Sequence, residues 1–192
     1  MTRPLARLAL GLVSAVALSG CSVARVEGPQ QDDLSTWRNT PLPPSAELGA
    51  RAADPNGSCS SGPDGERVTV ILQDRRTELT AAFLFHGAST FGSCIVTSGM
   101  QSGGSGPLPG PMDSPLTIDD NGAGTIVEKD VHELGGRVSP DIVAVTIHVA
   151  DGRTVEATVG GGYWLAWWPG NVPAQSVTGV DTAGNVIAET AP

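Results

Sequence analysis

Short runs of β-branched and aromatic residues most constrain what this chain can fold into. They recur about every 8–12 residues from residue 68 onward, and Gly, Asp, Asn and Pro separate them. The sequence contains no convincing helical pattern longer than two turns. The spacing therefore predicts an all-β fold, either one antiparallel β-sandwich or a small barrel. The expected strands are residues 68–72, 79–86, 93–97, 116–119, 124–128, 141–149, 153–159, 163–168, 176–180 and 185–188.

The best-defined hairpin joins residues 141–149 to residues 153–159. A two-residue Asp-Gly loop would mix apolar and polar side chains on both faces. A three-residue loop with Gly152 in the left-handed conformation sets Ile147 opposite Val155 and makes one face apolar. We therefore expect the three-residue loop. The other expected positions are Val143 opposite Val159, Val145 opposite Ala157, and His148 and Glu156 on the outer face.

Composition divides the chain into a proline-rich segment and one globular domain. Residues 21–65 read as a disordered tether with little apolar periodicity, although Trp37 and Leu42 are candidates for local docking. Residues 66–190 suit a single β-rich domain of the immunoglobulin-like kind. Within it, residues 99–115 have the composition of a long flexible loop. The expected hairpin turn after that loop is Asp120-Asn121-Gly122.

The N-terminus has the pattern of an export signal. Arg3 and Arg7 precede an apolar stretch over residues 8–18, which is too short for the roughly 20 residues of a spanning helix. The ending Leu18-Ser19-Gly20-Cys21 resembles the lipobox of bacterial lipoproteins. The resemblance implies cleavage of residues 1–20, a diacylglycerol thioether on Cys21, and anchoring to the outer face of the cell membrane. The alternative is a plain signal peptide that ends in a chance cysteine.

The charge balance narrows the choice of partners. The formal net charge is −9, and cleavage of the signal peptide would remove Arg3 and Arg7 and leave −11. An acidic chain is a poor match for nucleic acid and for anionic lipid surfaces. We therefore expect contact with the membrane through the lipid anchor alone, and an envelope protein or glycan as the partner.

Cys59 and Cys94 are the two cysteines outside the lipobox. Two thiols in an exported protein favour a disulfide. The alternative, a pair of metal ligands, lacks a nearby CxxC motif or histidine pair. We expect the disulfide.

The C-terminal third resembles a module found in exported or membrane-tethered actinobacterial proteins of unassigned function. The resemblance covers residues 136–188 and implies no chemistry. The segments that carry it are Gly136-Arg137-Val138, Pro140-Asp141-Ile142, Asp151-Gly152-Arg153, Ala166-Trp167-Trp168-Pro169-Gly170, and Asp181 with Gly184.

Catalytic and metal motifs are weak in this sequence. His86, His132 and His148 accompany no GxSxG motif, and each is expected at the surface or on an edge strand. Residues 119–122 lack EF-hand spacing and read as a solvated turn, and Asp130, His132 and Glu133 read as an exposed acidic connector. We therefore predict no catalytic residue, metal or cofactor. An enzyme with an unrecognised site is the second alternative.

The aromatic cluster is the strongest functional candidate in the sequence. It consists of Tyr163, Trp164, Trp167 and Trp168 on one expected strand. Because side chains alternate between faces, Trp164 and Trp168 should oppose Trp167, and at least one Trp should lie outside the core. An exposed Trp could anchor a protein or stack on a sugar. The alternative is a sheet covered on both faces. We expect a lipid-anchored binding or accessory protein, with a carbohydrate-binding or cell-wall-binding module as the first alternative.

Overall fold

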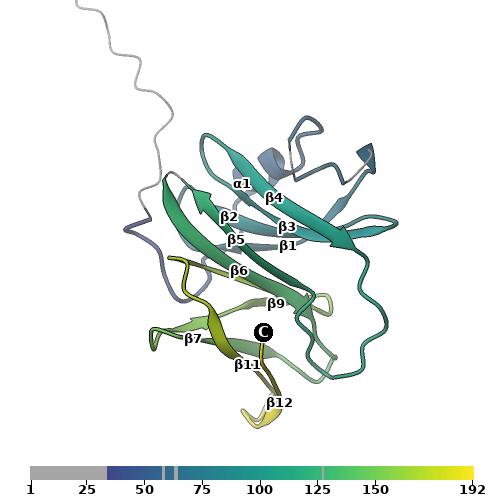
Figure 1. Cartoon of the computed structure of the whole chain (residues 1–192), viewed down its shortest axis with the longest axis vertical. Helices are drawn as coiled ribbons and strands as arrows, with labels where there is room; N and C mark the ends of the chain where they lie inside the picture. Colours follow the sequence, from purple (N-terminus) through teal and green to yellow (C-terminus); the bar gives the residue numbers. More distant parts are fainter. Residues whose placement is uncertain (1–33, 58, 63–64, 127) are drawn as a thin grey trace, which may run out of the picture.

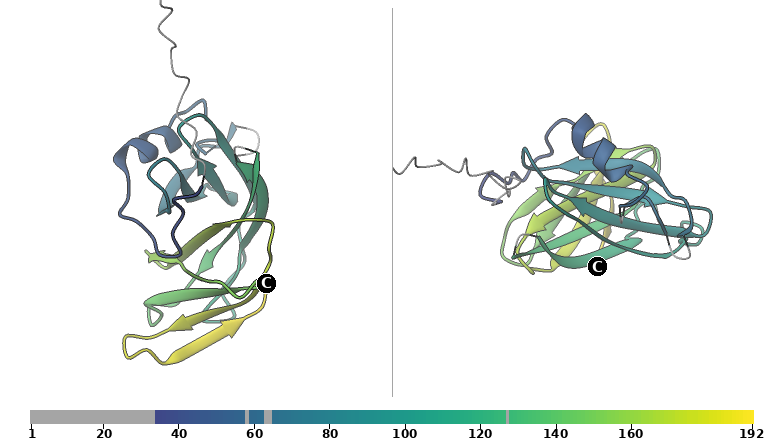
Figure 2. Two further views of the ribbon diagram at one scale, coloured as in Figure 1. Left: turned by 90° about the vertical axis from the view of Figure 1, so that its left-hand side faces the viewer. Right: turned by 90° about the horizontal axis from the view of Figure 1, so that it is seen from above.

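The computed structural model describes residues 34–57, 59–62, 65–126 and 128–192. Three antiparallel, four-stranded sheets form the body of the described chain (Figures 1 and 2). The predicted all-β, sandwich-like class is confirmed, with three open sheets in place of the usual two.

The first sheet has the order β1 (Thr69–Arg75), β2 (Ala81–His86), β3 (Thr90–Val96), β4 (Gln101–Pro107). The middle sheet has the order β5 (Asp120–Ile126), β6 (Lys129–Arg137), β10 (Tyr163–Pro169), β9 (Thr158–Gly160). The third sheet has the order β12 (Val186–Thr190), β11 (Ala174–Val180), β7 (Ala144–Val149), β8 (Thr154–Glu156).

The middle sheet takes part in two hydrophobic cores, one on each face. Trp164 and Trp168 of β10 pack with Ile147 of β7 in the core shared with the third sheet. Trp167, from the opposite face of β10, packs with Leu84 of β2 in the core shared with the first sheet. A strand covered on both faces needs apolar residues at every position, which explains the continuous run Trp-Leu-Ala-Trp-Trp.

The hairpin between β7 and β8 has the predicted register. Ile147 pairs with Val155, and Gly152 lies in the three-residue loop with a φ of +88°. The expected pairing of Val143 with Val159 is wrong, because β8 ends at Glu156 and the chain leaves the third sheet after Ala157, whose N–H donates to Val145 O at 2.9 Å. Val159 pairs instead with Trp164 in the middle sheet. Val143 is left 48% exposed.

Two segments expected outside strands are strands. Residues 101–107 lie inside the expected loop 99–115, yet they form β4 and pair with β3 over its whole length. Gly103 fits against β3 because a Cβ there would lie 2.5 Å from the Cβ of Cys94. The predicted turn at Asp120-Asn121-Gly122 is also wrong, because these residues begin β5, and the chain reverses only after Ile126, which pairs with Lys129.

The N-terminal strap, residues 34–57 and 59–62, packs on the sheets at two places: Leu34 and Trp37 lie against the core between the first and middle sheets, and the helix covers the outer face of the first sheet. It includes α1 (Ala46–Ala52), whose Leu48 and Ala52 pack on Phe83 and Phe85 of β2. The prediction that the folded part begins near residue 66 is therefore wrong. The side chains of Phe83 and Phe85 would be exposed to water on this face of the sheet if α1 did not pack on them. The expected docking of Trp37 and Leu42 is confirmed, since Trp37 Nε1 donates to Trp167 O at 3.2 Å and Leu42 N donates to Arg75 O at 2.7 Å.

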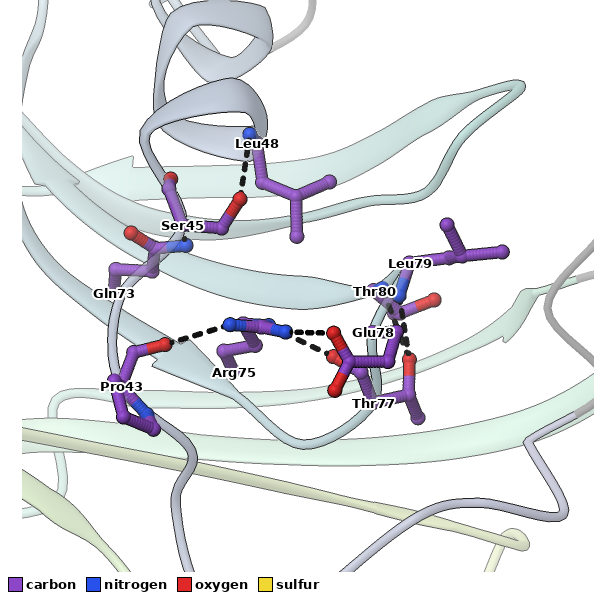
Figure 3. A network of polar contacts seen from close by, with 9 residues as sticks. All are labelled: Pro43, Ser45, Leu48, Gln73, Arg75, Thr77, Glu78, Leu79 and Thr80. Atoms are coloured by element: carbon purple, nitrogen blue, oxygen red, sulfur yellow. Dashed lines mark hydrogen bonds and ion pairs between the residues drawn. The ribbon is translucent and has the colours of Figure 1, made fainter.

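A polar network holds the strap against the turn between β1 and β2 (Figure 3). Arg75 donates to Pro43 O and to Thr77 O, each at 3.0 Å, and pairs with Glu78. Ser45 caps α1 by accepting from Leu48 N at 3.3 Å. The strap is thus held against the first sheet by hydrogen bonds to its backbone carbonyls as well as by apolar contacts.

A disulfide between Cys59 and Cys94 joins the strap to β3, as predicted. Both cysteines are buried in the cluster between α1 and the first sheet. The closed loop spans 35 residues, for which the chain-entropy relation gives a stabilisation of about 3–4 kcal/mol.

None of the described helices is long and apolar enough to cross a membrane.

Candidate functional site

The aromatic cluster lies inside the molecule. Trp164, Trp167 and Trp168 are each 0% exposed, because the first and third sheets cover both faces of β10. The expectation that at least one Trp lies outside the core is therefore wrong. Tyr163 is half-buried and stacks on Phe91 of β3, with ring centroids 6.2 Å apart.

Each buried indole also has a structural hydrogen bond. Trp164 Nε1 donates to Thr117 O at 2.9 Å, Trp167 Nε1 to Asp74 O at 3.0 Å, and Trp168 Nε1 to Val172 O at 2.9 Å. These acceptors belong to three segments that run past the middle sheet. The tryptophans thus bind the layers together, which leaves them unavailable to an external partner.

An open cleft of about 670 Å³ separates β4 from β5, at one edge of the first and middle sheets. Its volume is within the range of ligand pockets. Each of these two strands is the outermost of its sheet, so each presents one unpaired backbone edge. The β4 wall consists of Gly and Ser over residues 102–106, and the β5 wall includes Gly122 and Gly124. Such walls expose backbone hydrogen-bonding groups that bulkier side chains would cover.

Two carboxyl groups on the inner face of the middle sheet line this cleft, those of Asp120 and Glu133. On neighbouring strands, Asp120 lies opposite Gly135 and Glu133 lies opposite Gly122. A Cβ at Gly122 would lie 2.8 Å from Glu133 Oε1, so glycine at this position makes room for the carboxyl group. The register thereby places two acids diagonally on one face, each facing a residue without a side chain.

The two carboxyl groups are poorly solvated and poorly paired. Asp120 Oδ2 and Glu133 Oε2 are buried and have no hydrogen-bond partner in the described part of the protein. Desolvation, together with the smaller effect of the nearby Asp120 charge, raises the pKa of Glu133 to about 7. Desolvation also raises the pKa of Asp120. The Ser93 hydroxyl on β3 opposes both shifts, but it has one proton to donate.

The neighbouring Asp119 has a different environment. Arg137 on β6 donates to both of its carboxylate oxygens, from Nε at 2.8 Å and from Nη2 at 3.0 Å. Arg137 Nη1 also donates to Gly110 O at 2.7 Å, which fixes the connection between β4 and β5. Asp119 is therefore neutralised, whereas no Lys, Arg or His among the described residues lines the cleft. The charge of the Asp120–Glu133 pair is left uncompensated.

The three histidines lie apart from this pair. His132 is on the opposite face of β6, stacked on Trp168 with ring centroids 4.9 Å apart, and its Nε2 lies 3.1 Å from Asn121 Oδ1. Burial lowers the pKa of His132, which favours the neutral ring. His86 ends β2, and His148 is on the partly exposed face of β7. Within the described residues, no group of three or more His, Cys, Asp or Glu is placed to hold a metal ion.

Sequence reasoning missed the carboxyl pair because it placed both acids outside strands. Asp130, His132 and Glu133 were expected in an exposed connector, yet they belong to β6, the longest strand of the middle sheet. Strand alternation over residues 131–135 places Val131, Glu133 and Gly135 on one face. Gly135 and Gly136 hide this alternation, since glycine carries no hydropathic signal.

Cys21, the expected lipidation site, lies outside the described residues.

Comparison of the chain with protein-family models, curated proteins and solved structures finds no match.

Proposed function

We propose that this protein is a lipid-anchored, extracytoplasmic binding protein whose ligand site is the cleft between β4 and β5. The observation that carries the proposal is the pair of buried, unpartnered carboxyl oxygens on Asp120 and Glu133 in an open cleft. Buried polar atoms without partners are rare and destabilising, and they require an explanation. A ligand that supplies the missing donors provides one.

The location rests on the N-terminal pattern. The lipobox-like ending at Cys21 supports a lipid anchor on the outer face of the cell membrane. The disulfide between Cys59 and Cys94 is typical of an oxidising compartment. Replacement of Cys21 by Ala should move the protein from the membrane fraction to the medium.

Glycan binding through the aromatic cluster has no support in this arrangement. A sugar that stacks on Trp needs an exposed ring, and the three tryptophans of the cluster are buried. A glycan ligand would therefore have to use the polar cleft, through hydrogen bonds.

Site-specific photo-crosslinking in cells tests the proposal. A photoreactive residue replaces Ser105, which is exposed on the β4 wall of the cleft, in the full-length anchored protein. The matched control carries the same residue at Thr182, exposed in the turn after β11. The expected result is a discrete adduct from position 105 and none from position 182. Adducts of equal yield at both positions, or none at position 105, would contradict a binding role for the cleft.

A further inference from the structure

The inference concerns the chemical class of the ligand, and it rests on the proposed function of the cleft. Asp119, Asp120 and Glu133 are the titratable residues among those that line it. Asp119 is already paired with Arg137. The strands that face Glu133 and Asp120 contribute Ser93 from β3 and uncharged Gly and Ser residues from β4. The site thus combines uncompensated negative charge with unmet hydrogen-bond acceptors.

A primary ammonium group meets both requirements at once. It carries one positive charge and three N–H donors, enough for Asp120 Oδ2 and Glu133 Oε2 with one left over. A planar guanidinium matches a single carboxylate in a bidentate fork, and is less suited to two carboxyl groups on separate strands. Ca²⁺ takes six to eight oxygen ligands, which exceeds what two carboxyl groups supply.

The local geometry places both carboxyl groups beside the cleft. Glu133 Oε1 occupies the space beside Gly122, where a Cβ would lie 2.8 Å from it, so no side chain at position 122 separates this carboxyl group from the cleft. Asp120 begins β5 and lines the same cleft. We propose that the Asp120–Glu133 pair is a binding site for a primary ammonium group presented by the ligand of the cleft.

Binding at this pair is linked to proton release. Glu133, with a pKa of about 7, holds a proton for part of the time at neutral pH. An ammonium group binds best when both carboxyl groups are ionised, so its arrival expels that proton. An alkyl amine with a pKa near 10 stays charged throughout, and its affinity should therefore rise about tenfold from pH 6 to pH 8.

An NMR titration of the folded protein tests this inference. The probes are Nα-acetyl-lysinamide, its Nε-acetylated neutral counterpart, and Nα-acetyl-argininamide. Glucosamine beside N-acetylglucosamine at pH 6.5 shows whether an amino sugar can present the group. The readouts are the backbone amide shifts of β4 and β5 and the Kd at pH 6 and pH 8. The expected result is that an ammonium probe shifts these amides, whereas its acetylated form and the guanidinium bind at least tenfold more weakly.

Variants separate the pair from general charge effects. Glu133→Gln and Asp120→Asn should each weaken ammonium binding at least tenfold, and Glu133→Gln should also abolish the rise with pH. Glu189→Gln removes an exposed carboxylate on β12 and should leave binding unchanged. Preserved amide dispersion confirms that each variant is folded.

Three outcomes would overturn the inference. They are equal affinity for acetylated and free amines, equal weakening by Glu189→Gln, or no shift of cleft amides by any ammonium probe at 100 mM. In each case a specific adduct from position 105 would still support the binding role of the cleft. Failure of both experiments would reject both proposals.

Discussion

Arg76 joins three parts of the chain from one buried position. Its Nε donates to Asp74 Oδ2 at 2.8 Å, and both side chains of this ion pair are 0% exposed. Its Nη atoms donate to Asn39 O in the strap, at 2.6 Å, and to Glu156 O in β8. Trp37 lies beside the guanidinium, with its ring 5.9 Å from Cζ. Each of the three guanidinium nitrogens donates at least one hydrogen bond, and such pairing is the condition under which a buried charge is tolerated.

Loss of the carboxylate from this pair should be costly. Asp74→Ala leaves Arg76 buried with an uncompensated charge, and it also removes the acceptor for Thr158 Oγ1. We expect the free energy of unfolding to fall by about 3–5 kcal/mol, measured by urea denaturation. Glu78→Gln is the control, because Glu78 is 75% exposed in its pair with Arg75 and should cost no more than about 1 kcal/mol. Equal losses in the two variants would contradict this ranking.

Glu133 should make stability depend on pH. Its pKa is about 7 in the folded protein, against an ordinary value of 4.5, so the folded state binds more protons between these values. Stability should therefore fall as pH rises from 4.5 through 7, by roughly 3 kcal/mol. Glu133→Gln should flatten this part of the profile, measured by denaturation at pH 5 and pH 8. If the variant keeps the wild-type slope, the titrating group is elsewhere.

At the level of elements, β4 owes its place to its neighbour rather than to its own sequence. Its residues have low strand propensity, but β3 supplies a full ladder of backbone partners. Gly103 also lies so close to β3 that no larger residue fits.

Two adjacent glycines test the placement of β4. Gly103→Ala would place a Cβ 2.5 Å from Cys94 Cβ and should destabilise the protein by about 1–3 kcal/mol. Gly104→Ala meets nothing within 4 Å and should stay within about 0.5 kcal/mol of wild type in urea denaturation. In a flexible loop, both changes would be tolerated alike.

The disulfide links the strap covalently to the first sheet, and its removal should lower the stability of the folded protein. The Cys59→Ala, Cys94→Ala double variant should lose about 2–4 kcal/mol, equivalent to roughly 4–16 °C in Tm by calorimetry. Disulfide reduction in the wild-type protein should lower its Tm in the same direction. An unchanged Tm in both experiments would show that the apolar contacts of α1 alone hold the strap.

Prediction from sequence succeeded where local pattern decides structure, and failed where a partner strand decides it. The β7–β8 register followed from matching apolar faces, and strands of β-branched residues such as β1 were found. In contrast, β4 and β6 contain glycines, which add nothing to an apolar or polar pattern. Their role is to allow close contact with neighbouring strands and side chains, and this role becomes visible only in the fold. The candidate site depends on both strands, so Ser93, Asp120 and Glu133 could not be brought together from sequence alone.

At the scale of the molecule, the middle sheet makes the three sheets interdependent. Its two faces supply Trp164 and Trp168 to one core and Trp167 to the other. Loss of either outer sheet would expose at least one of these large side chains to water. The layers are therefore expected to unfold together.

Coincident unfolding transitions should demonstrate this cooperativity. Near-UV circular dichroism follows the packing of the tryptophans, and far-UV circular dichroism follows the strands. We expect the two signals to give the same midpoint and slope in urea. A separate early transition in the near-UV signal would indicate that one outer sheet detaches first.

The disulfide also determines how mechanical tension would travel through the protein. A pull applied at residue 34, while a ligand is held in the cleft, passes along the strap to Cys59 and then through a covalent bond to Cys94. Cys94 adjoins Ser93, which lines the cleft. The force thus reaches β3 without passing along β1 and β2, and it meets the ligand where Asp120 of β5 and Glu133 of β6 line the cleft. The third sheet lies outside this route, so a pull on a protein tethered at its N-terminus leaves the hydrogen bonds of that sheet unloaded.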